Sequence, residues 1–381
     1  MRLAVIAGAD PLNVRTWSGT PYFMTKTLQK RFPELLPVRS PRPSWFPHLR
    51  RACLKMTGSR LDIYWSYSLA SRNAQRLANS LKAERIDVAV CIANCSLSAF
   101  LAEQLPTIHV SDATVPLMID YYAEFARLSK PLAQSALRLD RQSVLRSRAS
   151  LFSTQWAASS AIRDYGADPS RVHVVPWGAN IPAQEVPRHS ASAPNDVCHL
   201  VFIGVDWERK GGAIAAAAVS RLAAAGLAVK LHIIGANPEL LPKTDSIIVH
   251  GFINKSTREG RLEFDSIMSQ ASFLFVPTRQ DCSPMVFPEA NAYGLPVITT
   301  ATGGVPDVVC EGVNGHLLPI DATADAYADL IWSIWSDRSR YEQLRKSSRS
   351  RYDNVLNWNT WLSAVTPILL EAVGERVPSC S

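Results

Sequence analysis

The sequence has 381 residues, of which 47% are hydrophobic and 19% charged, so wholesale disorder is excluded and two domains of ordinary size are expected. Forty Lys and Arg residues against 33 Asp and Glu residues give a net charge of +7, which favours anionic partners such as phosphates, nucleotides or acidic lipid. No RNA- or DNA-binding motif accompanies this charge, so no nucleic-acid partner is expected.

The seven cysteines are scattered without CxxC spacing, which argues against a zinc site or a disulfide framework and favours a reducing, cytoplasmic setting. The opening MRLAVIAGAD is too short for a signal peptide and is typical of a buried strand. The longest apolar window, Ala213–Gly235, is interrupted by Arg221 and Lys230, as expected of a helix followed by a strand. We therefore expect a soluble protein, or one on the surface of a membrane.

The first apolar run, Leu3–Ala7, predicts a central parallel strand. The following loop contains Ser18-Gly19-Thr20-Pro21 just before an amphipathic stretch, Tyr22–Arg31, and this order is typical of a helix start. Gly19 would let a ligand approach the backbone closely, or it would belong to an ordinary helix cap. GxGxxG is absent, so an NAD-type site is not supported.

The next segment, Pro37–Arg60, mixes aromatic and basic side chains. It would contact anionic lipid head groups, as a peripheral protein does on the inner face of a membrane, or form a solvated helix and loop. Its aromatic and basic residues are Trp45, Phe46, Arg50, Arg51, Lys55 and Arg60.

A further predicted strand, Thr107–Val110, leads into a loop through His109, which is either a ligand-facing side chain or a structural one. A long basic segment, Phe125–Arg148, is mostly helical in pattern, and Pro131 is expected to break or kink it near its start. Strands alternate with helices throughout, which predicts an α/β doubly wound parallel sheet.

Residues 183–196 are rich in Pro, Ser and Ala without periodicity and predict a linker. The strand–loop–helix order restarts after it, with VDWERKGG between a strand, His199–Ile203, and an Ala-rich helix. We expect an N-terminal domain over 1–182 and a C-terminal domain over 197–357, with a last helix at about 358–381 that packs back on the first domain. The Trp residues of the C-terminal helices, Trp332, Trp335, Trp358 and Trp361, are expected to serve packing.

The richest stretch is Phe273–Pro319, which predicts a βαβ unit with two ligand-facing loops. Asp281 and Glu289 stand eight positions apart across the first loop, and Glu289 falls in the first turn of a short predicted helix. The pair Gly303 and Gly304 follows the second strand.

These residues resemble the retaining glycosyltransferases of family 4, which have the two-domain GT-B fold. The resemblance covers nearly the whole length but is stronger in the second half. It rests on Asp281-x7-Glu289 with TGGVPDVVCEGVNGHLLP, on FIGVDWERKGG, and on SSAIRDYGADPSRVHVVPWGANI before the linker, in the family's order.

The resemblance implies a nucleotide-diphosphate sugar as co-substrate, no resident cofactor and no metal. Lys210, assisted by Arg209, would bind the diphosphate at a helix N-terminus, Glu289 the ribose, and Asp281 with His109 the donor sugar. Gly19 would approach the diphosphate or the acceptor. Backbone N–H groups of the loop would meet the β-phosphate, and this loop comprises Ser283, Pro284, Met285, Val286 and Phe287.

The chain departs from the family pattern at several positions. The first acid is Asp281 where Glu is usual, and Pro284 replaces a loop glycine and so removes one N–H donor. Val205 follows Gly204 where the family has Arg. We predict a hexosyltransferase that uses a UDP- or GDP-sugar and a glycan, lipid-linked or small-molecule acceptor. The alternatives are a GT-B epimerase or phosphorylase and a non-catalytic sugar-nucleotide-binding protein.

Overall fold

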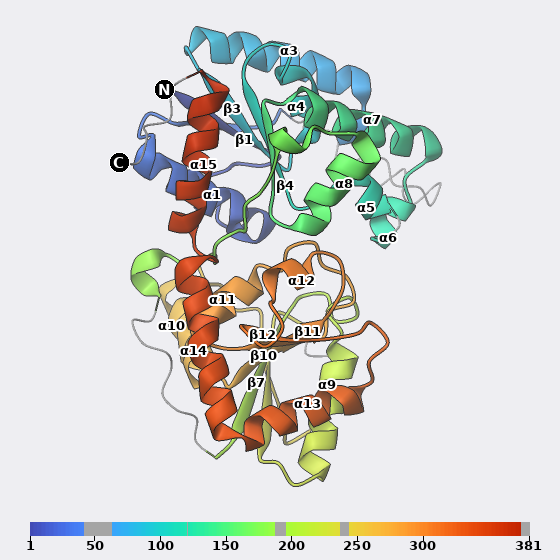
Figure 1. The fold of residues 1–381 in the computed structure, drawn as a ribbon, viewed down its shortest axis with the longest axis vertical. Helices are drawn as coiled ribbons and strands as arrows, with labels where there is room; N and C mark the ends of the chain where they lie inside the picture. The colour runs from blue at the N-terminus through green and yellow to red at the C-terminus, as the bar shows by residue number, and fades with distance from the viewer. Residues whose placement is uncertain (42–62, 120, 187–195, 237–243, 375–381) are drawn as a thin grey trace. The chain divides into compact units, whose positions relative to one another are not determined.

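The computed structural model describes residues 1–41, 63–119, 121–186, 196–236 and 244–374 (Figure 1). It divides into two compact units, which we call unit 1 (Met1–Pro176 with Trp358–Ser381) and unit 2 (Trp177–Asn357). Trp45–Arg60 lies outside the described residues, so membrane contact by that segment stays a prediction. Within the described ranges, none of the helices combines the length and the apolar character needed to cross a bilayer.

Unit 1 is built on a six-stranded parallel sheet in the order β2-β1-β3-β4-β5-β6. Four of its strands, β1, β3, β4 and β5, are buried along their whole length, as the apolar runs predicted. The strands are β1 (Leu3–Ala7), β2 (Leu36–Arg39), β3 (Val88–Ile92), β4 (Thr107–Ser111), β5 (Ala149–Phe152) and β6 (Val172–Val174).

The helices of unit 1 cover this sheet, and the last helix of the chain contacts the first, beside which it lies in Figure 1. They are α1 (Thr20–Arg31), α3 (Tyr67–Ala83), α4 (Cys95–Leu101), α5 (Val115–Ile119), α6 (Ala123–Ala126), α7 (Lys130–Arg146), α8 (Gln155–Tyr165) and α15 (Trp358–Ala372).

Unit 2 repeats the design with six parallel strands in the order β12-β11-β10-β7-β8-β9. The strands are β7 (Cys198–Ile203), β8 (Val229–Ile234), β9 (Ile247–Gly251), β10 (Phe273–Val276), β11 (Val297–Thr300) and β12 (Gly315–Leu318). The helices are α9 (Gly212–Ala224), α10 (Arg258–Gln270), α11 (Val286–Ala292), α12 (Val305–Val308), α13 (Ala324–Ser336) and α14 (Arg338–Asn354).

Each sheet confirms the predicted doubly wound α/β class. In unit 2 the chain begins in the middle of the sheet at β7, extends outward through β8 and β9, and then returns to β10 on the other side. The strand order therefore reverses between β7 and β10. In open α/β sheets, ligands bind at such a reversal, outside the carboxyl ends of the two strands.

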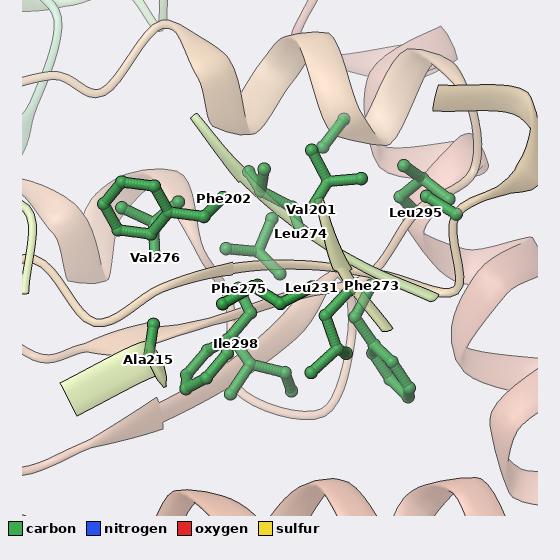
Figure 2. Packing of buried hydrophobic residues seen from close by; sticks show 14 of the residues in the cluster. Val201, Phe202, Ala215, Leu231, Phe273, Leu274, Phe275, Val276, Leu295 and Ile298 are labelled. Carbon is green, nitrogen blue, oxygen red and sulfur yellow. The ribbon is translucent and has the colours of Figure 1, made fainter. Parts of the chain in front are cut away.

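The core of unit 2 includes the central strands that end at this edge. Figure 2 shows side chains of the central strands, among them Phe202, Leu231, Phe273 and Phe275, gathered in one apolar cluster. These four side chains are fully buried. Burial of a large apolar side chain contributes about 1.5–3 kcal/mol, so these side chains stabilise the strands that carry the polar loops.

Two details of the helices bear on the sequence-based expectations. The predicted basic helical segment is broken near its start, since α6 ends at Ala126 and α7 begins at Lys130, with Pro131 in its first turn, where a proline sacrifices no hydrogen bond. Of the four C-terminal Trp residues, Trp335, Trp358 and Trp361 are buried as expected, whereas the Trp332 side chain is exposed.

Three histidines form a row across β7, β8 and β9. His199 Nδ1 lies 2.9 Å from His232 Nε2, and His232 Nδ1 lies 3.0 Å from His250 Nε2. Partial burial lowers the pKa of each ring, to about 4 for the central His232, where the two neighbouring rings and Lys230 add to the effect. Glu263 on α10, whose carboxylate lies 3.7 Å from His250 Nδ1, opposes the shift of His250 alone.

This row makes unit 2 sensitive to acid. A ring whose pKa is lower in the folded than in the unfolded chain stabilises the fold above the unfolded value of about 6.5, and that stability is lost as the pH falls toward the folded value. Between pH 7.5 and 5.5 the thermal midpoint of the wild type should therefore fall more steeply than that of His232→Gln. Parallel pH profiles of the two midpoints would contradict this expectation.

Candidate functional site

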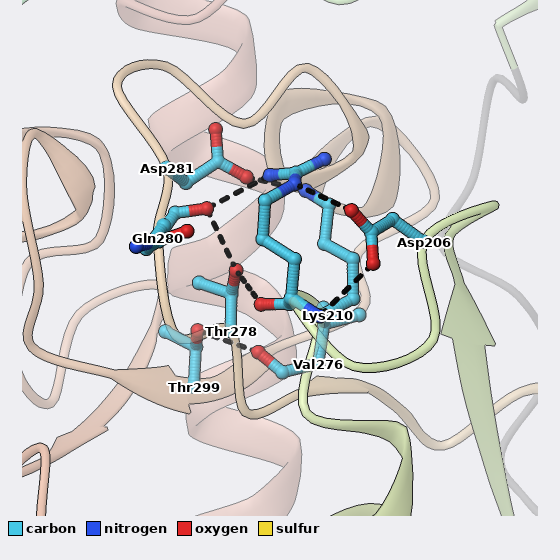
Figure 3. Close-up of polar contacts among 8 residues, drawn as sticks. Asp206, Lys210, Val276, Thr278, Gln280, Asp281 and Thr299 are labelled. Atoms are coloured by element: carbon cyan, nitrogen blue, oxygen red, sulfur yellow. Dashed lines mark hydrogen bonds and ion pairs between the residues drawn. The ribbon is translucent and has the colours of Figure 1, made fainter. Parts of the chain in front are cut away.

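The polar loops of unit 2 meet at the reversal of strand order. The loop after β7 runs to Gly211 and carries Lys210, and the loop after β10 carries Asp281. The two side chains form an ion pair in which both partners are nearly buried. Figure 3 shows this pair between the two loops. The structure thus joins the predicted diphosphate-binding lysine directly to the predicted sugar-contacting acid.

Arg209 also spans the two loops. Its guanidinium donates to the Gln280 carbonyl at 2.8 Å and pairs with Asp206 at 3.4 Å, and its own carbonyl accepts from the Arg279 N–H at 2.7 Å. Both predicted cations therefore have partners in this state. A bound diphosphate would share them with the acids or replace those acids.

Two glycines let the lysine loop lie against β10. Gly211 has a φ of +74°, and a Cβ atom built there would lie 2.0 Å from the Pro277 carbonyl oxygen. At the neighbouring Gly212, a Cβ atom would lie 2.1 Å from the Trp207 ring. The Gly-Gly pair after Lys210 thus serves close backbone approach, which fixes where the lysine side chain begins.

We expect Gly211→Ala to destabilise unit 2 by about 1–3 kcal/mol or more, because backbone strain and a backbone clash act together. Gly226→Ala is the matched control, since Gly226 also has a positive φ (+92°) but open space around its missing Cβ. Thermal unfolding of both variants checks the prediction. Equal losses of stability would show that strain alone matters and that the approach to Pro277 does not.

Glu289 lies in α11 and is buried, with only 2% of its side chain exposed. Both of its carboxylate oxygens accept from Lys255 Nζ at 2.8 Å. Lys255 was not found from the sequence, because it lies 34 positions before Glu289 in the loop between β9 and α10. The sequence Asn-Lys-Ser around it is typical of polar turns in general, so nothing in the local sequence indicates a ligand-binding lysine.

The loop before α11 uses part of its own donor capacity. The Phe287 N–H donates to the Pro284 carbonyl at 3.1 Å, and the Glu289 N–H donates to the Met285 carbonyl at 3.3 Å. In the predicted phosphate-binding loop 283–287, the Phe287 N–H is thus already hydrogen-bonded within a turn. Pro284 has no N–H group that could donate to a phosphate. The Asp281 carbonyl accepts from the Gly304 N–H at 3.2 Å, which connects the acid loop to the Gly-Gly turn.

Arg279 is a second residue that the sequence reading missed. It follows β10 directly, and its backbone connects the lysine loop to the turn after β11 through Arg209 and Thr302. Within the described part of the chain, its side chain makes no hydrogen bond or ion pair. It therefore adds a cation at the same edge whose charge no acid there offsets.

The remaining predicted residues, Gly19 and His109, belong to unit 1. Gly19 precedes α1 with a φ of +87° and follows two residues, Trp17 and Ser18, that also have positive φ. A Cβ atom at Gly19 would lie 3.1 Å from the Val14 carbonyl oxygen. The conformation of the loop thus accounts for this glycine.

His109 lies within β4, as the predicted strand Thr107–Val110 places it. It is only 1% exposed, and its Nδ1 lies 2.9 Å from Ser143 Oγ of α7, so contact between His109 and the donor sugar stays a prediction. Burial lowers the pKa of His109 to about 4, so the ring is neutral near pH 7. β4 continues two residues past His109, to Ser111. The His109 side chain contacts α7 through Ser143.

No group of three or more His, Cys, Asp or Glu side chains in the described ranges is arranged to hold a metal ion. The histidine row of unit 2 is extended along hydrogen bonds rather than convergent on a point. The charged groups at the sheet edge of unit 2 instead include three acids and four cations, a set that suits a phosphorylated ligand. The acids are Asp206, Asp281 and Glu289, and the cations are Arg209, Lys210, Lys255 and Arg279.

Residues 198–337 match the family model of the group 1 glycosyl transferases. The chain is similar to D-inositol 3-phosphate glycosyltransferase of Xylanimonas cellulosilytica, at 25% identity over 65% of this chain and 62% of that protein. The protein of the same name from Mycobacterium bovis is 24% identical over 59% of this chain and 49% of its own length. The chain thus spans less than two thirds of the length of either relative.

Solved structures match along nearly the whole chain. Anabaena HepE in complex with UDP has a TM-score of 0.67 at 14% identity, covering 97% of this chain and 100% of that one. A glycosyltransferase from Rickettsia africae has a TM-score of 0.66 at 12% identity, covering 98% and 99%. Residues 198–337 of unit 2 are thus similar to the group 1 glycosyl transferases, and the chain shares the GT-B fold of these solved structures along nearly its whole length.

Proposed function

We propose that this protein transfers a hexosyl group from a UDP- or GDP-sugar to a hydroxyl group of a glycan, lipid-linked or small-molecule acceptor. The observation that carries the proposal is the position of Lys210, Asp281 and Glu289 at the reversal of strand order in unit 2. The positive charge of Lys210 suits a diphosphate, and the buried carboxylate of Glu289 can accept hydrogen bonds from the hydroxyl groups of a ribose. UDP is the first nucleotide to test, since Anabaena HepE was solved with UDP and with UDP-glucose.

The donor would lie with its diphosphate at Lys210, where Arg209 and Arg279 add positive charge. Asp281 would pass from its pairing with Lys210 to a hydroxyl of the donor sugar, so that donor binding rearranges this ion pair. Cations placed where charge develops on the departing diphosphate stabilise the transition state.

We further propose that transfer retains the anomeric configuration and needs no metal. The acceptor oxygen would form its bond to the anomeric carbon on the face that the diphosphate leaves. The bond between that carbon and the diphosphate oxygen breaks, and the acceptor proton passes to the leaving diphosphate. Lysine and arginine charges would then perform the neutralisation that a divalent cation provides elsewhere.

Calorimetry with UDP, GDP, ADP and dTDP in the presence of EDTA tests the donor site. Tight binding of one diphosphate, followed by its release from the corresponding sugar nucleotide when an acceptor is added, is the expected result. Binding without turnover of any sugar donor would favour a non-catalytic sugar-nucleotide-binding protein. Failure of every diphosphate to bind, with or without Mg²⁺, would refute the proposal.

A further inference from the structure

Lys255 and Glu289 form a donor–acceptor pair at the proposed nucleotide site. The ammonium group donates to both carboxylate oxygens at 2.8 Å. It also lies 4.9 Å from the centre of the Phe264 ring, a cation–π distance. Three contacts thus fix the position of one nitrogen, which is unusual for a long and flexible side chain.

The backbone that carries Lys255 is also fixed. Asn254 Oδ1 accepts from the Ser256 N–H at 3.2 Å and from its hydroxyl at 2.6 Å, which closes a tight turn around Lys255. Thr257 then caps α10 by accepting from the Gly260 N–H at 3.2 Å. A Cβ atom at Gly260 would lie 2.4 Å from the Asn254 carbonyl oxygen, so this turn packs directly on the helix.

Exposure decides which member of the pair a ligand reaches. The Lys255 side chain is 34% exposed, whereas Glu289 is 2% exposed. A ligand that arrives from solvent therefore meets the lysine before it can reach the carboxylate. The assignment of ribose binding to Glu289 alone does not fit this arrangement.

We propose that Lys255 and Glu289 together bind the vicinal diol of the ribose, and that Lys255 is a specificity-determining residue for the nucleotide. A hydroxyl group both donates and accepts, so one hydroxyl donates to Glu289 while its neighbour accepts from Lys255. The ammonium has three N–H groups, of which the two carboxylate oxygens occupy two. This inference rests on the proposed function, because it requires a ribonucleotide in the site.

The test compares Lys255→Met with the wild type, using UDP, GDP, their 2′-deoxy and 3′-deoxy forms, and inorganic pyrophosphate. We expect Lys255→Met to lower the affinity for the ribonucleotide about 10- to 100-fold, as removal of a charged hydrogen bond does. Its preference for the ribo form over the deoxy forms should shrink, and pyrophosphate affinity should not change. Lys230→Met is the matched control, since Lys230 is a half-buried lysine on β8 that donates to the Asp245 carbonyl at 2.6 Å.

A double-mutant cycle separates binding from structural support. Because Lys255 and Glu289 bind different hydroxyl groups in this proposal, Lys255→Met should still weaken ribonucleotide binding in a Glu289→Gln background, where no buried carboxylate is left unpaired. Equal loss of UDP and pyrophosphate affinity, or no further loss of ribonucleotide affinity in the Glu289→Gln background, would overturn the inference. A wild type that binds no nucleoside diphosphate would instead refute the proposed function itself.

Discussion

Replacing Glu289 by Gln is expected to weaken nucleoside diphosphate binding by roughly 100-fold, about 3 kcal/mol, and to remove most of the transferase activity. The amide has the shape of the carboxylate but only one acceptor oxygen and no charge. That oxygen can still accept from Lys255 Nζ. Calorimetry with the bound diphosphate and thermal unfolding of the same samples measure both effects.

Glu311→Gln is the matched control for this substitution. Glu311 is also an acid of unit 2 with bound carboxylate oxygens, which pair with His316 and accept from the Leu317 N–H at 2.8 Å. Its amide variant should bind the nucleotide like the wild type. Wild-type kinetics of Glu289→Gln at limiting donor would exclude Glu289 from the donor site.

Replacing Lys210 by Met is expected to lower the affinities for the nucleoside diphosphate and for pyrophosphate alike, by about 10- to 100-fold. The affinity for the free nucleoside should not change. Methionine keeps the apolar stem that packs near Gly204 but removes the ammonium. Asp281 would then keep its negative charge without the lysine opposite it, and this nearly buried carboxylate would repel the diphosphate. Titrations with UDP, pyrophosphate and uridine compare the three ligands directly.

The double variant Lys210→Met with Asp281→Asn removes both charges of the pair. It should recover part of the diphosphate affinity that the single variant loses, because the repelling carboxylate is gone. Lys230→Met again serves as the control for loss of a half-buried lysine. Diphosphate affinity that is unchanged in Lys210→Met would place the diphosphate elsewhere in the protein.

The sequence predicted the sheets and the loops of unit 2 well because both follow from local rules. Continuous apolar runs predicted buried parallel strands, and loops after such strands necessarily meet at one edge of the sheet. Lys210, Asp281 and Glu289 each follow or flank such a strand, so a one-dimensional pattern sufficed to bring them together.

The misses have a common cause in contacts between distant segments. His109 was expected to lead from its strand into a loop, but β4 continues to Ser111, which still pairs with Phe152 in the sheet. The boundary between α13 and α14 lies at Asp337, whose side chain accepts from the Arg340 N–H at 3.0 Å and so begins the second helix. Lys255 could not be chosen among the lysines, because only the folded chain brings it to Glu289.

The division of the chain has a consequence for its synthesis. Unit 2 is one continuous segment, whereas unit 1 requires α15, whose contacts with α1 and β4 join the two ends of the described chain. On the ribosome, unit 2 can complete its sheet while unit 1 still lacks its closing helix. A gene fragment that encodes 177–357 therefore carries every residue of the proposed donor site, while one that encodes 1–176 omits part of its own unit.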